Sequence, residues 1–236
     1  MVEEAQRRRR NRREYAMTRT AGHLLDTLTA KLAPDPGDNP LLPLIAAGTA
    51  DRATLAVLAL EQHLVIASDH RSFARLAQRA ANEAPASAAF FRLLADGEAV
   101  AAGHLTVFAR ACGVDEERAA AHEPLPGCQA YPSYVARLAL EAAPADAVLA
   151  LTANFASWGG YCATIGRALR HHYDLTDEAC AFFDFFAEPS PDLDKSARTA
   201  VEEGWEAGRL DERLAQRHGR LLQSYESMFW STLARL

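Results

Sequence analysis

The sequence predicts an all-α protein folded as a single bundle of seven or eight helices. Apolar side chains recur at three- and four-residue steps along most of the 236 residues, and strand-like alternation of apolar and polar residues is absent. Clusters of proline and glycine separate these periodic stretches, as at residues 34–40. One bundle is the economical arrangement, because no shift in composition divides the chain after residue 17.

The limits of the periodic stretches give the expected helices. Gly113 stands where the C-cap of a helix is expected, and Pro144 interrupts an otherwise continuous pattern. A loop is expected through Pro124, Pro126 and Pro132. The helices are predicted over residues 18–33, 49–81 (one long helix or two in tandem), 87–112, 133–142, 145–172, 192–207 and 209–235, with an aromatic segment at 182–186.

The composition is that of an ordinary globular protein, with 49% hydrophobic and 24% charged residues. No apolar run is long enough to cross a bilayer, and no hydrophobic segment follows the basic N-terminus as it would in a signal peptide. The four cysteines form no C-x-x-C pair and are expected to be reduced thiols. These features predict a cytoplasmic protein without membrane contact.

Charge is distributed unevenly along the chain. The first sixteen residues hold six arginines against three glutamates and so carry a charge of about +3. Because the formal net charge of the whole chain is −6, the remaining residues carry about −9. An acidic body is not typical of a protein that binds nucleic acid. Residues 1–17 are expected to be a disordered basic extension, with Met17 as an alternative start, and residues 18–236 the helical domain. The alternative is a basic arm that contacts phosphate or an anionic membrane.

Polar side chains on apolar helix faces are the candidates for a binding site, because bundle sites are built from inward-facing residues. Glu226 lies on the same face as Leu222 and Phe229, and a buried carboxyl group needs a partner or a raised pKa. Glu61 lies near a core face beside Gln62. The alternative for each acid is a flanking position paired with a nearby arginine.

The predicted helix over 145–172 mixes hydrogen-bonding and aromatic groups at three- and four-residue steps. This composition is expected of a pocket for a small aromatic ligand, although the same residues also suit a packed core. Cys162 in particular has the alternative of an inert, small hydrophobic residue. The candidates are Asn154, Phe155, Trp158, Tyr161 and Cys162.

Other site classes find little support in the sequence. The Glu-x-x-His pairs of di-iron bundles are absent, and His63 and His70, seven residues apart, have no later matching set. There is no glycine-rich phosphate loop and no G-x-S-x-G nucleophile turn. No metal and no cofactor are therefore expected.

The chain resembles the TenA/PqqC family, which includes the thiaminase II enzymes and has the haem-oxygenase-like fold. The resemblance covers most of the chain from about residue 20. It rests on Glu98 followed by Gly103-His104-x-x-x-Phe108, on Tyr131-Pro132-Ser133-Tyr134, and most specifically on Tyr225-Glu226-Ser227-Met228-Phe229-Trp230 near the C-terminus.

The resemblance implies a homodimer or homotetramer with a small-molecule ligand, and it gives Glu226 the role of general acid/base on a pyrimidine substrate. Family thiaminases carry a nucleophilic cysteine in a Pro-Cys-x-x-x-Tyr context, where this chain has Asn154-Phe155 and then Ser157 four residues before Tyr161. Cys162 would lie about 10 Å further along the helix axis. Cys162 and Ser157 are the candidate nucleophiles. The family's Gln-Asp step, which supplies a substrate-binding aspartate, corresponds to Glu61-Gln62.

Three functions follow as hypotheses. The first is a divergent TenA-like protein that binds an aminopyrimidine-type heteroaromatic, and that would be a hydrolase related to thiamine salvage if it is an enzyme. In it Glu226 is the acid/base, and Glu61, Gln62, Tyr134, Asn154, Trp158, Tyr161 and Trp230 hold the ligand. The second is a non-catalytic ligand-binding or regulatory protein of the same fold. The third is an oxidase of the wider superfamily.

Overall fold

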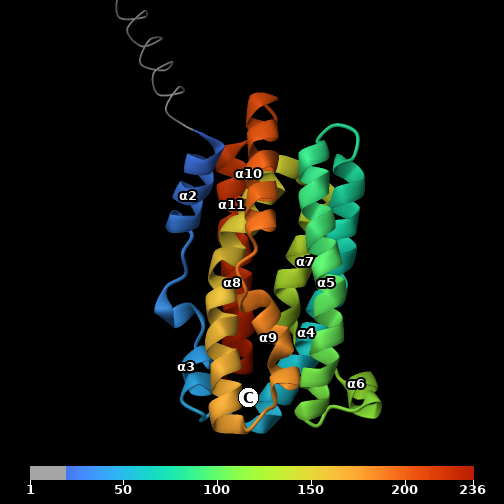
Figure 1. The fold of residues 1–236 in the computed structure, drawn as a ribbon, viewed down its shortest axis with the longest axis vertical. Helices are drawn as coiled ribbons and strands as arrows, with labels where there is room; N and C mark the ends of the chain where they lie inside the picture. The colour runs from blue at the N-terminus through green and yellow to red at the C-terminus, as the bar shows by residue number, and fades with distance from the viewer. Residues whose placement is uncertain (1–19) are drawn as a thin grey trace, which may run out of the picture.

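The computed structural model describes residues 20–236, and every regular element in that range is a helix. The long helices run roughly along the long axis of the molecule (Figure 1). They are α4 (Arg52–Ala80), α5 (Pro85–Ala111), α7 (Pro126–Glu141), α8 (Pro144–Tyr173) and α11 (Glu212–Leu233). The shorter elements are α2 (Ala21–Lys31), the 3-10 turn η1 (Pro36–Asp38), α3 (Leu41–Ala46), α6 (Glu116–Ala121), α9 (Asp177–Ala187) and α10 (Pro191–Glu206).

The all-α prediction is confirmed, and within the described range eight helices contain eleven or more residues. The stretch predicted over 49–81 is one continuous helix, α4. Three short elements, η1, α3 and α6, were not predicted, because helices of a turn or two are too short to display a period. The predicted extension over 1–17 lies outside the described residues. None of the helices in 20–236 is both long and apolar enough to span a membrane.

The antiparallel pair of α4 and α5 forms one side of the bundle (Figure 1). Pro85 occupies the first turn of α5, where a missing N–H costs nothing. At the other end Gly113 adopts φ +75°. The Gly113 N–H donates to the carbonyl of Arg110 and the Val114 N–H donates to that of Ala109, each with an N···O distance of 2.9 Å. This closure confirms the predicted C-cap, because glycine enters the left-handed region without a Cβ clash.

The start of α7 differs from the sequence prediction. The predicted loop through Pro132 is wrong, because α7 begins at Pro126 and contains Pro132 as a buried residue. Pro126 stands in the first turn, which proline favours, and a side chain from another helix fixes that turn: Glu61 on α4 accepts the Leu125 N–H over 2.7 Å. The positions of proline and glycine alone do not predict a helix start that depends on a tertiary contact of this kind.

The buried apolar residues form two large clusters. One contains Phe108, Ile165 and Phe183, and the other contains Phe90 and Val148. Each of the five long helices contributes residues to both clusters. The two clusters are therefore stacked along the bundle, and the region where they meet is where the candidate site lies.

Candidate functional site

A cavity of about 1080 Å³ lies between the helices of the bundle and is open to solvent on the side of Glu188, Ser190 and Asp194. Its wall includes Ile66 and Trp230 from one apolar cluster and Phe90 and Leu94 from the other. All five long helices contribute to the lining, together with α2, α9, α10 and the connection between α9 and α10. The volume is at the upper end of the range found for small-molecule sites.

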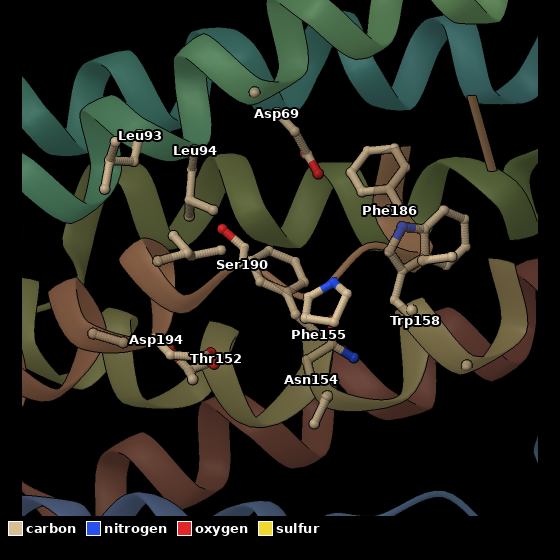
Figure 2. A pocket seen from close by; sticks show the side chains of 18 of the residues that line it. Asp69, Leu93, Leu94, Thr152, Asn154, Phe155, Trp158, Phe186, Ser190 and Asp194 are labelled. Carbon is tan, nitrogen blue, oxygen red and sulfur yellow. The ribbon is translucent and has the colours of Figure 1, made fainter. Parts of the chain in front are cut away.

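Aromatic rings form one side of the cavity. The ring of Trp158 on α8 lies 5.6 Å from that of Phe186 on α9 and 5.9 Å from that of Trp230 on α11, centroid to centroid. Figure 2 shows Phe155, Trp158 and Phe186 facing the same space. A planar ligand ring would find edge and face contacts there.

Gly159 allows this aromatic wall to form. A Cβ at Gly159 would lie 3.0 Å from the backbone carbonyl oxygen of Phe186, which is tighter than ordinary contact. The absence of a side chain lets the end of α9 approach α8 closely. Phe186 is thereby placed against Trp158.

Glu226 on α11 is the central polar group of the cavity wall. Its side chain is buried. Oε2 accepts a hydrogen bond from Asn154 Nδ2–H at an N···O distance of 2.7 Å, and Oε1 accepts one from Trp230 Nε1–H at 3.3 Å. Burial raises the pKa of Glu226 to about 7, against the lowering effect of the two hydrogen bonds. Near neutral pH the carboxyl group therefore exists in both protonation states, as a general acid/base requires.

A sequence model described as "TENA/THI-4/PQQC family" matches residues 40–235. The chain belongs to the TENA/THI-4/PQQC family. A comparison with curated proteins finds no match.

Solved TenA-family structures share the fold at low identity. A TenA homologue from P. horikoshii has 15% identity and a TM-score of 0.64, covering 91% of this chain and 96% of that one. A TenA homologue from Pseudomonas syringae has 11% identity and a TM-score of 0.69, with 92% and 91% covered. A domain of unknown function with a heme oxygenase-like fold from Shewanella denitrificans has 16% identity and a TM-score of 0.57, with 91% and 86% covered. The haem-oxygenase-like fold is thereby established for this chain.

Six of the residues predicted for the site line the cavity of this TenA-family chain: Gln62, Asn154, Phe155, Trp158, Glu226 and Trp230. Asn154 is held on its other side by Gln223, whose Oε1 accepts a second Nδ2–H over 3.0 Å. The amide is thus fixed with its nitrogen toward the carboxyl group. Because Asn154 and Glu226 lie on different helices, the sequence pattern placed each on an apolar face without showing that they touch.

The two predicted nucleophiles do not line the cavity. Cys162 is fully buried in the apolar cluster, and burial, followed by the charge of Glu226, raises the pKa of its thiol well above the ordinary value. A thiol that stays protonated is a poor nucleophile. Ser157 is half-buried on α8 and outside the lining. Tyr161 is packed behind Trp230, with ring centroids 6.0 Å apart, and burial and then the charge of Glu226 raise its pKa to about 12.

Glu61 also lies away from the cavity, although its neighbour Gln62 lines it. The Glu61 carboxyl group is fully buried and accepts three hydrogen bonds, from His122 Nε2 at 2.8 Å, the Leu125 N–H at 2.7 Å and Gln129 Nε2 at 2.6 Å. Its role is to join α4 to the start of α7. Of these two neighbours on α4, only Gln62 lines the cavity.

Tyr134 faces another part of the molecule. Its hydroxyl group lies 2.8 Å from His218 Nδ1, and its ring contacts that of Tyr225 at a centroid distance of 5.3 Å. Tyr131, one turn earlier on α7, lines the cavity instead. The aromatic start of α7 does contribute to the site, by a different tyrosine from the one expected.

Two further acids lie in the cavity wall and were not predicted to belong to the site. They are Asp69 on α4 and Glu98 on α5, and Glu98 entered the sequence predictions only as part of the family resemblance. Asp69 stands seven residues after Gln62 and so shares its helix face, which is the signal that would have found it. The charges of Asp69, Glu226 and Glu98 all raise the pKa of Tyr131, after burial. Tyr131 therefore lies among three carboxyl groups. Within residues 20–236 no group of three or more His, Cys, Asp or Glu side chains is arranged to hold a metal ion.

Proposed function

We propose that this TenA-family protein binds a small, planar, nitrogen-bearing heteroaromatic of the aminopyrimidine type, and that Glu226 exchanges a proton with it. The observation that carries the proposal is the Glu226 carboxyl group, buried beside aromatic rings with a pKa of about 7. A ring nitrogen or exocyclic amino group is the matching partner for such a carboxyl group. Trp158, Phe155 and Phe186 supply contacts to the ring faces and edges.

The two hydrogen bonds to Glu226 define how the proton is exchanged. Asn154 and Trp230 each donate to a different carboxyl oxygen, so the orientation of the group is fixed before a ligand binds. The protonated acid donates to a basic nitrogen, and the ionised form accepts from an N–H or from water. Preorganisation of this kind removes the cost of reorienting the group during reaction.

Hydrolysis is the reaction that the cavity supports best. The bond from carbon to a nitrogen leaving group breaks, and water supplies the oxygen of the new carbon–oxygen bond. Glu226 accepts a proton from that water and returns a proton to the departing nitrogen, so that the carboxyl group ends as it began. Water is assigned as the nucleophile because none of the four cysteines is among the lining residues, all of which lie within 20–236.

Ligand binding without catalysis is the second candidate. It is favoured by the position of Cys162, which is buried in the apolar cluster and not exposed to the cavity. Under this alternative Glu226 serves only to recognise a basic nitrogen. Turnover distinguishes the two candidates, and binding does not.

The proposal includes a homodimer or homotetramer in the cytoplasm. The free thiols in the described part of the chain suit a reducing compartment. Leu93, Val100 and Val107 are exposed apolar residues at seven-residue steps along α5, a spacing that places them on one helix face. Light scattering after size-exclusion chromatography tests this part, and a monomer at micromolar concentration contradicts it.

The test of the main proposal is a titration of the protein with aminopyrimidines and thiamine, followed by mass spectrometry of the products. We expect binding of an aminopyrimidine, and hydrolysis that is lost in Glu226→Gln. Glu188→Gln is the matched control, because Glu188 also lines the cavity but is exposed to solvent. Binding without turnover by the wild type supports the second candidate, and no binding of any heteroaromatic contradicts both.

A further inference from the structure

Two carboxyl groups in the cavity wall have oxygens without hydrogen-bond partners. Asp69 on α4 and Glu98 on α5 are 3% and 9% exposed, and both line the cavity. Asp69 Oδ1 and Glu98 Oε2 are buried and accept no hydrogen bond. Leaving such an atom unpaired is costly, so two in one place call for an explanation.

Glu61 on the same helix as Asp69 shows what a structural acid looks like in this protein. Its two oxygens receive three hydrogen bonds from the polypeptide. No comparable partner reaches the free oxygens of Asp69 and Glu98, and His70, the next residue after Asp69, directs Nδ1 to the backbone carbonyl of Ala95 over 2.9 Å. The pair is therefore not satisfied within the fold.

The whole cavity wall is short of positive charge. Arg198 is the single basic residue among the lining residues, and it pairs with Asp26 at 3.2 Å. The carboxyl groups in the lining are those of Asp26, Asp69, Glu98, Glu188, Asp192, Asp194 and Glu226. A cavity with this imbalance favours cationic ligands over neutral or anionic ones.

Asp69 and Asn154 enter the cavity from opposite sides. Figure 2 shows Asp69 on one side of the cavity and Asn154 of α8 on the other, with Phe155 between them and Phe186 beside Asp69. A ligand whose ring lies against these aromatic residues and near Glu226 would direct its other end toward α4 and α5. That end meets the unpaired oxygens.

We propose that Asp69 and Glu98 form a subsite for a protonated primary amine carried by the ligand. An ammonium group has three N–H donors and no acceptor, so it can donate to Asp69 Oδ1 and Glu98 Oε2 together and compensate one negative charge of the pair. The ligand is thus an aromatic molecule with an aminoalkyl substituent. The inference rests on the cavity being the ligand site, as proposed above, but not on proton exchange at Glu226.

The test uses the full-length protein and two probes of nearly the same shape, 2-phenylethylamine and 2-phenylethanol, titrated calorimetrically at neutral pH. Neither probe has a ring nitrogen, and the amine can pair either with Asp69 and Glu98 or with Glu226, so the variants below decide between the two positions. We expect the amine to bind with a Kd about tenfold or more below that of the alcohol, which corresponds to one charge-assisted contact.

The decisive variant is Asp69→Asn combined with Glu98→Gln, which keeps shape and removes both charges. We expect it to abolish the preference for the amine and to leave the affinity for the alcohol unchanged. Asp194→Asn is the matched control, because Asp194 lines the same cavity from an exposed position. If the double variant does not fold, Glu98→Gln alone is measured and is expected to reduce the preference.

Several outcomes overturn the inference. These are equal binding of the two probes, no binding of the amine, or an equal loss of preference in Asp194→Asn, which would assign the effect to the general field. Stabilisation by manganese or zinc chloride in preference to the amine, lost in the double variant, would make the pair a metal site instead. Binding of aminopyrimidines without any preference for amines would refute this subsite and leave the proposed function standing.

Discussion

Asn154 and Glu226, 72 residues apart in the sequence, are joined by a hydrogen bond of 2.7 Å inside the bundle. The bond links α8 to α11 at the wall of the cavity. Its donor is held by Gln223, and its acceptor is the group with a pKa of about 7. The properties of the carboxyl group therefore depend on an amide from another helix, and they respond when that amide is changed.

Replacement of the amide is expected to raise the pKa of Glu226 further. In Asn154→Leu the carboxylate loses its shorter hydrogen bond while burial is kept, so the neutral form is favoured. Carbon-detected NMR of the Glu226 carboxyl group as a function of pH measures the change. Ser224→Ala, on the exposed side of α11, is the control and is expected to leave the titration unchanged. An unaltered titration in Asn154→Leu would show that the hydrogen bond does not stabilise the carboxylate.

Glu226 also makes stability depend on pH. Its pKa is about 7 in the folded protein against an ordinary value of 4.5, so the neutral carboxyl group favours folding below pH 4.5 and this contribution is lost as the pH rises to about 7. The loss is about 3 to 4 kcal/mol at most. Asp69 and Glu98, whose pKa values burial also raises, act in the same direction. The difference between wild type and Glu226→Gln isolates one group.

Urea unfolding at pH 5 and pH 8 measures this dependence. The wild type is expected to lose more stability between the two values than Glu226→Gln does, because glutamine does not titrate. Parallel losses in the two proteins would contradict the raised pKa. Glu188→Gln again serves as the control.

Neighbouring residues on α4 are expected to give opposite results. Glu61→Leu leaves the His122, Leu125 and Gln129 donors unpaired and should reduce the free energy of unfolding by about 3 kcal/mol or more. Gln62→Leu should change ligand affinity with little effect on stability, since Gln62 lines the cavity. Thermal unfolding and ligand titration of both variants test the contrast. A stability loss confined to Gln62→Leu would reverse the assignment.

The cysteine next to Tyr161 is expected to be chemically silent. Burial raises the pKa of both the Cys162 and the Cys112 thiols, so accessibility decides, and iodoacetamide should label the half-buried Cys112 in preference to the buried Cys162 in the native protein. Cys162→Ala should cost about 1 to 2 kcal/mol of stability through a small cavity and leave ligand affinity unchanged. Mass spectrometry of the labelled peptides gives the order of reaction. Early labelling of Cys162 would return it to consideration as a nucleophile.

Local patterns were sufficient for much of the fold but only part of the site. The period along 49–81 predicted α4, and glycine chemistry predicted the end of α5 at Gly113, because both depend on residues close in sequence. The start of α7 could not be predicted in this way. It depends on Glu61, a residue of another helix, which turns a proline-containing stretch into a helix.

The same division holds within the site. The apolar face of α11 identified Glu226, and that of α8 identified Asn154. The distinction between Glu61 and Gln62 required the helix to be oriented against its neighbours, since adjacent residues point about 100° apart. Asp69 lies on the same helix face as Gln62, two turns further along, but the sequence does not show how far a cavity extends along that face.

The meeting of the two apolar clusters at the cavity has a mechanical consequence. All five long helices run from one cluster to the other. At the cavity, where side chains do not fill the space, the two clusters are therefore connected mainly by the helix backbones. A ligand that fills the cavity would contact residues of both apolar clusters and so connect them through its own atoms. Amide hydrogen exchange around residues 152–160 and 226–230 should then slow together when ligand binds, and the protein would open as one unit instead of two.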